Sequence, residues 1–247
     1  MIKSSQAASS IIRNGYCYFP RLIDDQFLRR LRCEAQYVID KHPYSYQNAY
    51  DESVQIGQIQ RPRAFLNIDK LFYSTLFFFN PFFIKTISNV LNKSPFHIAF
   101  NRQLIAQQTY PSNMPPSNVV HWDRLRSIKT WVYLSDTSYD SGPIKIIPRT
   151  HIANKHARVA SLQMLDKTNS LYDSIDNRST IITDENLESY LPRSFSAGDV
   201  LLFDTDTSHG ANKVSEGHSR FIYRSYSTLY SDLRLRSSIL NSFHHDN

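Results

Sequence analysis

Cysteine is scarce in this chain, which has only Cys17 and Cys33 among its 247 residues. Two cysteines cannot build a disulfide framework or a zinc site made of thiolates. A chain of this length buries enough apolar surface to fold without such cross-links. We therefore expect a reduced, cytoplasmic protein.

Long apolar runs are missing as well. The N-terminus lacks the apolar core of a secretory signal peptide. The longest apolar stretch, residues 76–84, is interrupted by Asn80 and Pro81. It is far shorter than the roughly 20 residues that a membrane helix needs, so we expect no membrane contact. Internal repeats and low-complexity segments are also absent.

The composition is that of a folded domain, with 41% hydrophobic and 20% charged residues. Aromatic residues reach 13%, which favours β-rich structure because flat side chains suit a pleated surface. The net charge of +6 permits nucleic-acid binding. No block of five like charges occurs, so we expect solvated charges, a small-molecule partner and no nucleic acid.

The residue pattern divides the chain into two parts within one domain of residues 1–247. Residues 1–95 are predicted to be mainly helical, with a short strand at 16–19 and helices that begin at Asp24 and at Asn80-Pro81. Short strands follow in a core of about residues 96–230, with candidates at 98–107, 119–123, 130–134, 144–147, 200–203 and 220–226. The polar stretch 154–186 is predicted to be a helical or irregular insertion. This order favours a mainly β protein, a jelly roll or sandwich buttressed by N-terminal helices.

The triplet His121-Trp122-Asp123 is the central chemical feature. On a strand, residues i and i+2 face the same way, so the imidazole and the carboxylate point to one side. His209 is the candidate for a third ligand. Two histidines and one carboxylate suit non-haem Fe(II) oxygenases, because they leave positions on the metal open.

The triplet alone is weak evidence, since chance gives about 0.6 such patterns in a chain of this composition. A second copy, His244-His245-Asp246, stands at the C-terminus, where chains are usually frayed. We interpret that copy as accidental. The segments that surround His121 and His209 carry the stronger argument.

Those segments are WVYLSDTSYDSGPIKIIPRTH at 131–151 and AGDVLLFDTDTSHGANKVSEGHSR at 197–220. Together with the His121 triplet, they resemble the phytanoyl-CoA dioxygenase family of Fe(II)/2-oxoglutarate oxygenases. That family shows the HxD motif, an acidic turn ending in Asn-Gly-Pro, a strand ending in Pro-Gly-Ser-His, and Gly-Asp before the distal histidine. An arginine follows at the spacing of Arg220. The likeness covers about residues 98–228, together with the entry segment 15–25.

The resemblance implies a double-stranded β-helix, a cupin-like jelly roll, with iron held by His121, Asp123 and His209. It also implies that 2-oxoglutarate chelates the iron and that its far carboxylate needs a buried cation. Arg220 fits by spacing, and a guanidinium offers a two-pronged contact that stays charged when buried. Arg224 is its rival, because it shares the strand face of Arg220. Trp131 matches a pocket-lining position of the family, with core packing as the alternative.

Other residues near the expected site leave alternatives open. Gln103 and Gln107 alternate with apolar residues, so Gln107 can face the barrel interior and contact the co-substrate or the substrate. The cations Arg124, Arg126 and Lys129 either bind an anionic substrate or line a solvated mouth. His151 is expected to be a turn residue or to support the ligands.

Three departures from the family pattern concern the turns and the pocket. Arg149-Thr150 replaces Gly-Ser, so the turn geometry can differ. Ala211 stands where a hydroxyl residue often contacts the co-substrate. The segment between Asp123 and Trp131 is short, which removes a loop that often lines the substrate pocket.

The implied chemistry uses Fe(II), 2-oxoglutarate and O₂ to oxidise an unactivated C–H bond of a small, anionic or carrier-bound metabolite, releasing succinate and CO₂. The carboxylate of Asp123 argues for hydroxylation, desaturation or ring formation and against halogenation, because related halogenases have a small residue there. The alternatives are an oxygenase acting on nucleic acid or protein, and a non-catalytic jelly-roll binding module. The four-residue spacing of Arg220 and Arg224 does not match the six-residue spacing of the alkylated-DNA repair oxygenases.

Overall fold

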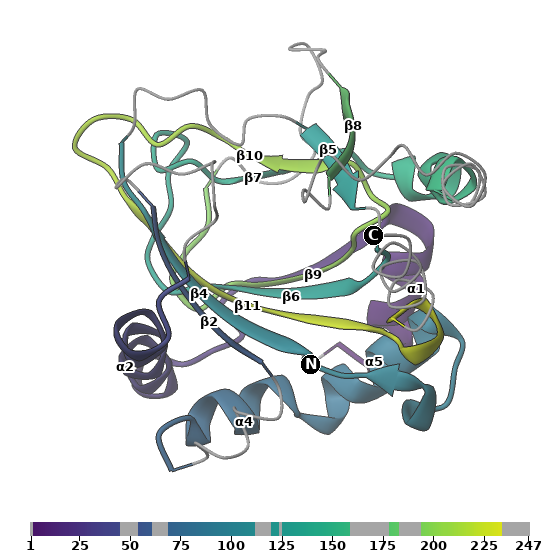
Figure 1. Ribbon diagram of the computed structural model, residues 1–247, viewed down its shortest axis with the longest axis horizontal. Helices are drawn as coiled ribbons and strands as arrows, with labels where there is room; N and C mark the ends of the chain where they lie inside the picture. The colour runs from purple at the N-terminus through teal and green to yellow at the C-terminus, as the bar shows by residue number, and fades with distance from the viewer. Residues whose placement is uncertain are drawn as a thin grey trace, which may run out of the picture.

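The computed structural model describes residues 2–44, 54–60, 69–111, 120–123, 125–158, 178–182 and 194–233, the segment 178–182 by its backbone alone. Two antiparallel sheets face each other, and helices cover the outer face of the larger one (Figure 1). This is the jelly roll that the sequence predicts. No described helix is both long enough and apolar enough to cross a membrane.

The major sheet is the seven-stranded one, in the order β1-β9-β6-β11-β4-β2, with β3 paired to β11. Its strands are β1 (Tyr16–Phe19), β2 (Val54–Gln60), β3 (Ile98–Ala99), β4 (Gln103–Thr109), β6 (Ile128–Tyr133), β9 (Val200–Asp204) and β11 (Arg220–Leu229). The minor sheet has the order β7-β10-β5-β8. It contains β5 (Val120–Asp123), β7 (Ile144–Ile146), β8 (Arg178–Ile182) and β10 (His209–Ala211).

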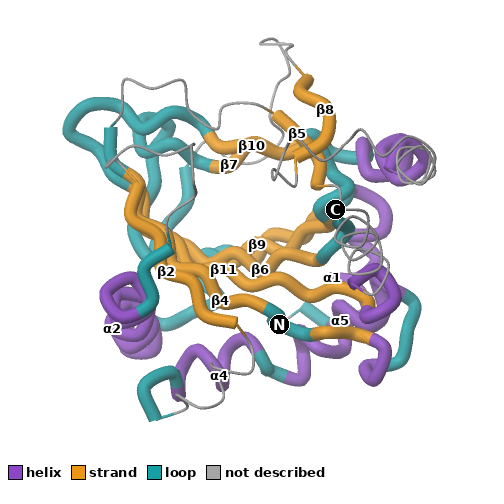
Figure 2. The backbone as a smooth tube through the Cα atoms, viewed as in Figure 1, coloured by secondary structure: helices purple, strands orange, loops and turns teal. Residues whose placement is uncertain are grey.

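Helices pack on the outer face of the major sheet (Figure 2). They are α1 (Ser4–Asn14), α2 (Asp25–Lys41), α4 (Phe72–Phe78) and α5 (Pro81–Leu91), and a 3-10 turn, η1 (Pro95–His97), leads into β3. Helix α2 begins as predicted, because the Asp24 side chain accepts a hydrogen bond from Phe27 N at 2.9 Å. Its apolar stripe, which includes Leu31 and Val38, is fully buried.

The structure adds strands that the sequence prediction passed over. β2 lies within the part predicted to be mainly helical and forms one edge of the major sheet. β8 lies within the predicted insertion, and β10 carries His209. The strand predicted at 98–107 is interrupted between β3 and β4, where Asn101 adopts a left-handed conformation with φ +46°.

The two sheets enclose an apolar layer that includes Trp131, Tyr133, Phe203 and Ile222. Register fixes which side chains enter this layer. On β11, Ile222 pairs with Tyr133, Arg224 with Trp131, and Tyr226 with Lys129. Because residues alternate between the faces of a strand, the basic and aromatic residues of these pairs all point toward the minor sheet.

Candidate metal centre

The three predicted ligands come together on the minor sheet. His209 is paired with His121 across β10 and β5, and Asp123 follows on the same face of β5. One ligand atom from each residue lies within 4.8 Å of the others. Oδ1 of Asp123 is 3.7 Å from Nε2 of His121 and 3.7 Å from Nε2 of His209. Trp122 is buried and, by strand alternation, points to the opposite face, as expected.

The protonation state of His209 suits a metal ligand. Its Nδ1 lies 2.7 Å from the carbonyl oxygen of Thr207, which can only accept a hydrogen bond. Nδ1 therefore carries the proton, and the lone pair of Nε2 faces the triad. Burial, supported by the nearby Lys129, holds the pKa of His209 well below its usual range. Two imidazole nitrogens and one carboxylate oxygen form the donor set that non-haem iron accepts.

Lys129 contributes a cation to the same cluster. Its Nζ lies 2.9 Å from Oδ2 of Asp123 and 3.0 Å from Nε2 of His209. The ammonium also lies 5.6 Å from the ring centroid of Phe203 and 5.1 Å from that of Tyr226. Lys129 thus lies inside the barrel beside the ligands, whereas the sequence placed it at a mouth or against a substrate.

Arg220 and Arg224 share the interior face of β11 at different depths. Arg220 is 2% exposed, and its guanidinium donates hydrogen bonds to the carbonyl of Gly142 and to Thr109 Oγ1. Arg224 lies over the ring of Trp131 at 5.2 Å. It also lies close enough to His209 to help lower the pKa of that imidazole.

Trp131 and Gln107 both lie on the interior face of the major sheet. Nε1 of Trp131 is buried and has no hydrogen-bond partner among the described residues. A bound carboxylate or carbonyl could satisfy this donor. Gln107 is buried and is the register partner of Ile222 across β4 and β11. Its side-chain Nε2 donates a hydrogen bond to Thr109 Oγ1 at 3.1 Å.

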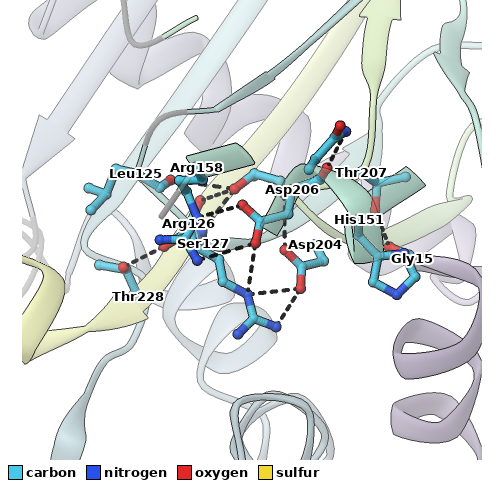
Figure 3. Close-up of polar contacts among 12 residues, drawn as sticks. Gly15, Leu125, Arg126, Ser127, His151, Arg158, Asp204, Asp206, Thr207 and Thr228 are labelled. Carbon is cyan, nitrogen blue, oxygen red and sulfur yellow. Dashed lines mark hydrogen bonds and ion pairs between the residues drawn. The ribbon is translucent and has the colours of Figure 1, made fainter. Parts of the chain in front are cut away.

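A network of buried charges braces the loop that precedes His209 (Figure 3). Arg126, from the loop between β5 and β6, donates two hydrogen bonds to Oδ2 of Asp204, at 3.0 and 2.6 Å. Arg158 donates from Nε to Oδ1 of Asp206 at 2.8 Å. Arg126 is therefore paired to acids and does not line an open mouth. Arg124 lies outside the described residues.

Asp206 is strained electrostatically within this network. Burial raises its pKa to about 6, and the neighbouring Asp204 carboxylate adds to the rise. Arg158 and Arg126 oppose the shift without cancelling it. Its backbone is fixed too, because Asp206 N donates to Oδ1 of Asp204 at 3.0 Å.

The N-terminal segment holds the same loop from the other side. The carbonyl oxygen of Gly15 accepts hydrogen bonds from Asp204 N at 2.9 Å and from Thr207 Oγ1 at 3.2 Å. Gly15 has φ +90°, and a Cβ there would lie 2.3 Å from Thr207 Oγ1, so glycine is required. Nε2 of His151 lies 2.9 Å from the carbonyl of Ile12, which makes His151 a supporting residue.

The Arg149-Thr150 turn supports the loop despite its departure from the family pattern. Arg149 takes φ +68°, a conformation that glycine favours. The hydroxyl of Thr150 accepts a hydrogen bond from Ser208 N at 2.8 Å. A helix begins at Thr150, and its Asn154 donates to the carbonyl of Asp206. The C-terminal copy, His244 to Asp246, lies outside the described residues.

Comparisons with known proteins agree with this fold. The phytanoyl-CoA dioxygenase (PhyH) family model matches residues 11–222. No curated protein matches the sequence significantly. Among solved structures, the epimerase SnoN, in complex with Fe3+, alpha ketoglutarate and nogalamycin RO, is 13% identical with a TM-score of 0.62. That alignment covers 91% of this chain and 83% of SnoN.

Two further solved structures share the fold. The carbocyclase SnoK from nogalamycin biosynthesis has a TM-score of 0.58 at 13% identity, over 92% of this chain and 85% of SnoK. HygX from Streptomyces hygroscopicus, with nickel and 2-oxoglutarate bound, has a TM-score of 0.59 at 12% identity, over 91% and 86% of the two chains. At such identities the likeness establishes the fold.

Proposed function

The chain belongs to the phytanoyl-CoA dioxygenase family of non-haem iron and 2-oxoglutarate-dependent oxygenases, and we propose that His121, Asp123 and His209 are its iron ligands. The observation that carries this proposal is the convergence of the three ligand atoms on one face of the minor sheet. The lone pair of His209 is already aimed at the shared space. Three protein ligands leave coordination positions for the co-substrate and O₂.

Bound Fe(II) and 2-oxoglutarate would supply the oxidising power, with 2-oxoglutarate decarboxylated to succinate and CO₂ as O₂ is consumed. The protein's contribution is orientation and the exclusion of water. Burial of Asp123 and His209, at 4% and 3% exposure, keeps bulk water away from two of the ligands. His121 is the more exposed ligand, so substrate would enter from its side.

For the co-substrate, we assign the far carboxylate to Arg220, with Arg224 as the alternative. Arg220 is the more buried of the two and heads β11. The indole N–H of Trp131 and the amide of Gln107 face the same interior and would complete the polar lining. The side chain of Ala211 cannot donate a hydrogen bond. Trp131 and Gln107 would therefore supply the donors to the co-substrate.

The substrate we propose is a small anionic or carrier-bound metabolite that is hydroxylated or otherwise oxidised at an unactivated C–H bond. The solved relatives include an epimerase and a carbocyclase from nogalamycin biosynthesis, so this fold supports more than one outcome. A substrate from specialised metabolism is therefore a reasonable first class to screen. We further propose that residues 1–247 act as one cytoplasmic domain.

The test is an anaerobic titration of metal-free protein with Fe(II) and 2-oxoglutarate, monitored by visible absorption. We expect the weak metal-to-ligand charge-transfer band of the chelate to appear. We expect it to be lost in His209→Ala, which removes a ligand, and retained in His156→Ala, which removes an exposed histidine. A folded protein that gives no band would overturn the proposal. A band that survives in His209→Ala would overturn the ligand assignment.

A further inference from the structure

Lys129 is an unusual neighbour for a metal site, because it is a buried cation that contacts two of the ligands. Its side chain is 7% exposed, and that of Asp123 is 5% exposed. A buried ammonium is costly unless it is paired, and its one carboxylate partner among the described residues is Asp123. The ammonium also lies within cation–π distance of the rings of Phe203 and Tyr226.

The two contacts of the ammonium differ in kind. On Asp123 the ammonium contacts Oδ2, whereas Oδ1 is the oxygen that faces both imidazole nitrogens. That contact is compatible with a metal on Oδ1. On His209 it takes Nε2, whose single lone pair is also the metal-binding one. The ammonium and a metal therefore compete for His209 while they share Asp123.

We propose that Lys129 is a positioning residue that makes metal binding and 2-oxoglutarate binding depend on each other. Resting on the proposed function, this inference adds a role for a residue outside the ligand set. A fixed positive charge beside the ligands weakens the binding of a divalent cation. The same charge favours the occupied site once 2-oxoglutarate has bound, because the two carboxylates of the dianion offset the positive charges of Lys129 and the metal. By thermodynamic linkage, each ligand then tightens the binding of the other.

The location of Lys129 gives the effect a clear direction. The backbone of Lys129 belongs to β6 of the major sheet, so the charge comes from the opposite side of the barrel to the sheet that carries the ligands. Its contact with Oδ2 of Asp123 leaves Oδ1 free for the metal, whereas its contact with Nε2 of His209 takes up the lone pair that the metal needs. Removing the charge should therefore help the metal alone and hinder the co-substrate.

The experiment measures the affinity of the full-length protein for Co(II) by calorimetry, with and without saturating 2-oxoglutarate. For Lys129→Met we expect Co(II) alone to bind about tenfold more tightly. We expect the tightening caused by 2-oxoglutarate to shrink by a similar factor. Lys129→Arg keeps the charge and should retain most of the coupling. Lys129→Gln lacks the charge but can still donate to Asp123, so it should behave like Lys129→Met and repeats the test should Lys129→Met not fold.

The matched control is Lys145→Met, which removes a half-buried lysine from β7 of the minor sheet. It should behave like the wild type. Equal coupling in wild type, Lys129→Met and Lys129→Gln would overturn the inference and leave the iron site standing. Loss of coupling in Lys129→Arg would also overturn it, because the charge would then not be the cause. A wild-type protein that binds no Co(II) would instead overturn the proposed function.

Discussion

The two sheets of this barrel are held together in different ways. In the major sheet, β2 and β4 are paired without interruption from Val54 and Thr109 to Gln60 and Gln103. In the minor sheet, β10 and β5 share one register pair, His209 with His121. The minor sheet nevertheless carries all three proposed ligands. The relative positions of β5 and β10 therefore depend on contacts beyond their own pairing.

The charged network around Asp204 and Asp206 supplies that support. It ties the loop before His209 to Arg126 and Arg158, while Gly15 anchors it from the N-terminal side. We therefore expect the long ladders of the major sheet to dominate the stability of the domain, and the contacts around Asp204 and Asp206 to position the ligands. Substitutions in the two sheets should thus have different consequences.

The largest expected effect is on global stability, from a cavity in the major sheet. Leu202 is fully buried against the helices, and Leu202→Ala should lower the free energy of unfolding by about 2–5 kcal/mol. Urea denaturation measures this loss. Affinity for Co(II) should stay within about twofold of wild type, because Leu202 faces away from the ligands.

The matched substitution in the minor sheet is Ile146→Ala. Ile146 is also fully buried, and it is paired with His209. We expect a smaller loss of unfolding free energy and a several-fold weaker affinity for Co(II). Equal changes in Co(II) affinity for Leu202→Ala and Ile146→Ala would show that the minor sheet has no special role in positioning the ligands.

The next prediction concerns Arg220 and Arg224, the two arginines of β11 that point from the major sheet toward the minor sheet. Arg220→Ala should raise the 2-oxoglutarate concentration needed for half-maximal turnover by at least about tenfold, since a buried charged contact is lost. Arg224→Ala should raise it less. Steady-state kinetics with 2-oxoglutarate as the varied component distinguishes the two. The reverse order would move the assignment to Arg224.

The smallest expected effect is the pH dependence of the bracing network. The pKa of Asp206 is raised to about 6 in the folded protein. As the pH falls, the folded protein therefore binds a proton at Asp206 at a higher pH than the unfolded chain does. Its contribution to stability therefore rises as the pH falls from 7 to 5, by about 1 kcal/mol. Asp206→Asn should lack this gain. Urea unfolding of both proteins at pH 5 and pH 7 gives the difference, and parallel pH profiles would contradict the shift.

Much of the site was predictable because its signal is local. The alternation of His121 and Asp123 on one strand places both on the same face, and the family spacing adds His209 and Arg220. Lys129 was misplaced because the predicted strand, 130–134, begins one residue after it, whereas β6 begins at Ile128. It stands two residues before Trp131 on the same strand, so both must face the interior.

The rest depended on contacts between residues distant in the chain. The partners of Arg126 are Asp204, at the end of β9, and Asp206, just after it, and no spacing rule connects them to Arg126. β2 lacks the strict alternation that marks a half-buried strand, because Ile56 and Ile59 are three residues apart and are both buried, on opposite faces of the sheet. Its place at the edge of the major sheet follows only from the pairing with β4.

The pairing of β1 with β9 has a consequence for how the polypeptide reaches its native state. Tyr16 lies beside Phe203, so one of the first strands to be synthesised pairs with one of the last. Helices α1 and α2 can form early, but the sheet that covers their apolar faces is completed only when β9 and then β11 have been synthesised. Pairing between strands so far apart in the sequence slows folding. It leaves a partly folded intermediate with exposed apolar surface in the meantime. During biosynthesis, the nascent chain should therefore depend on chaperones until its C-terminal third has emerged.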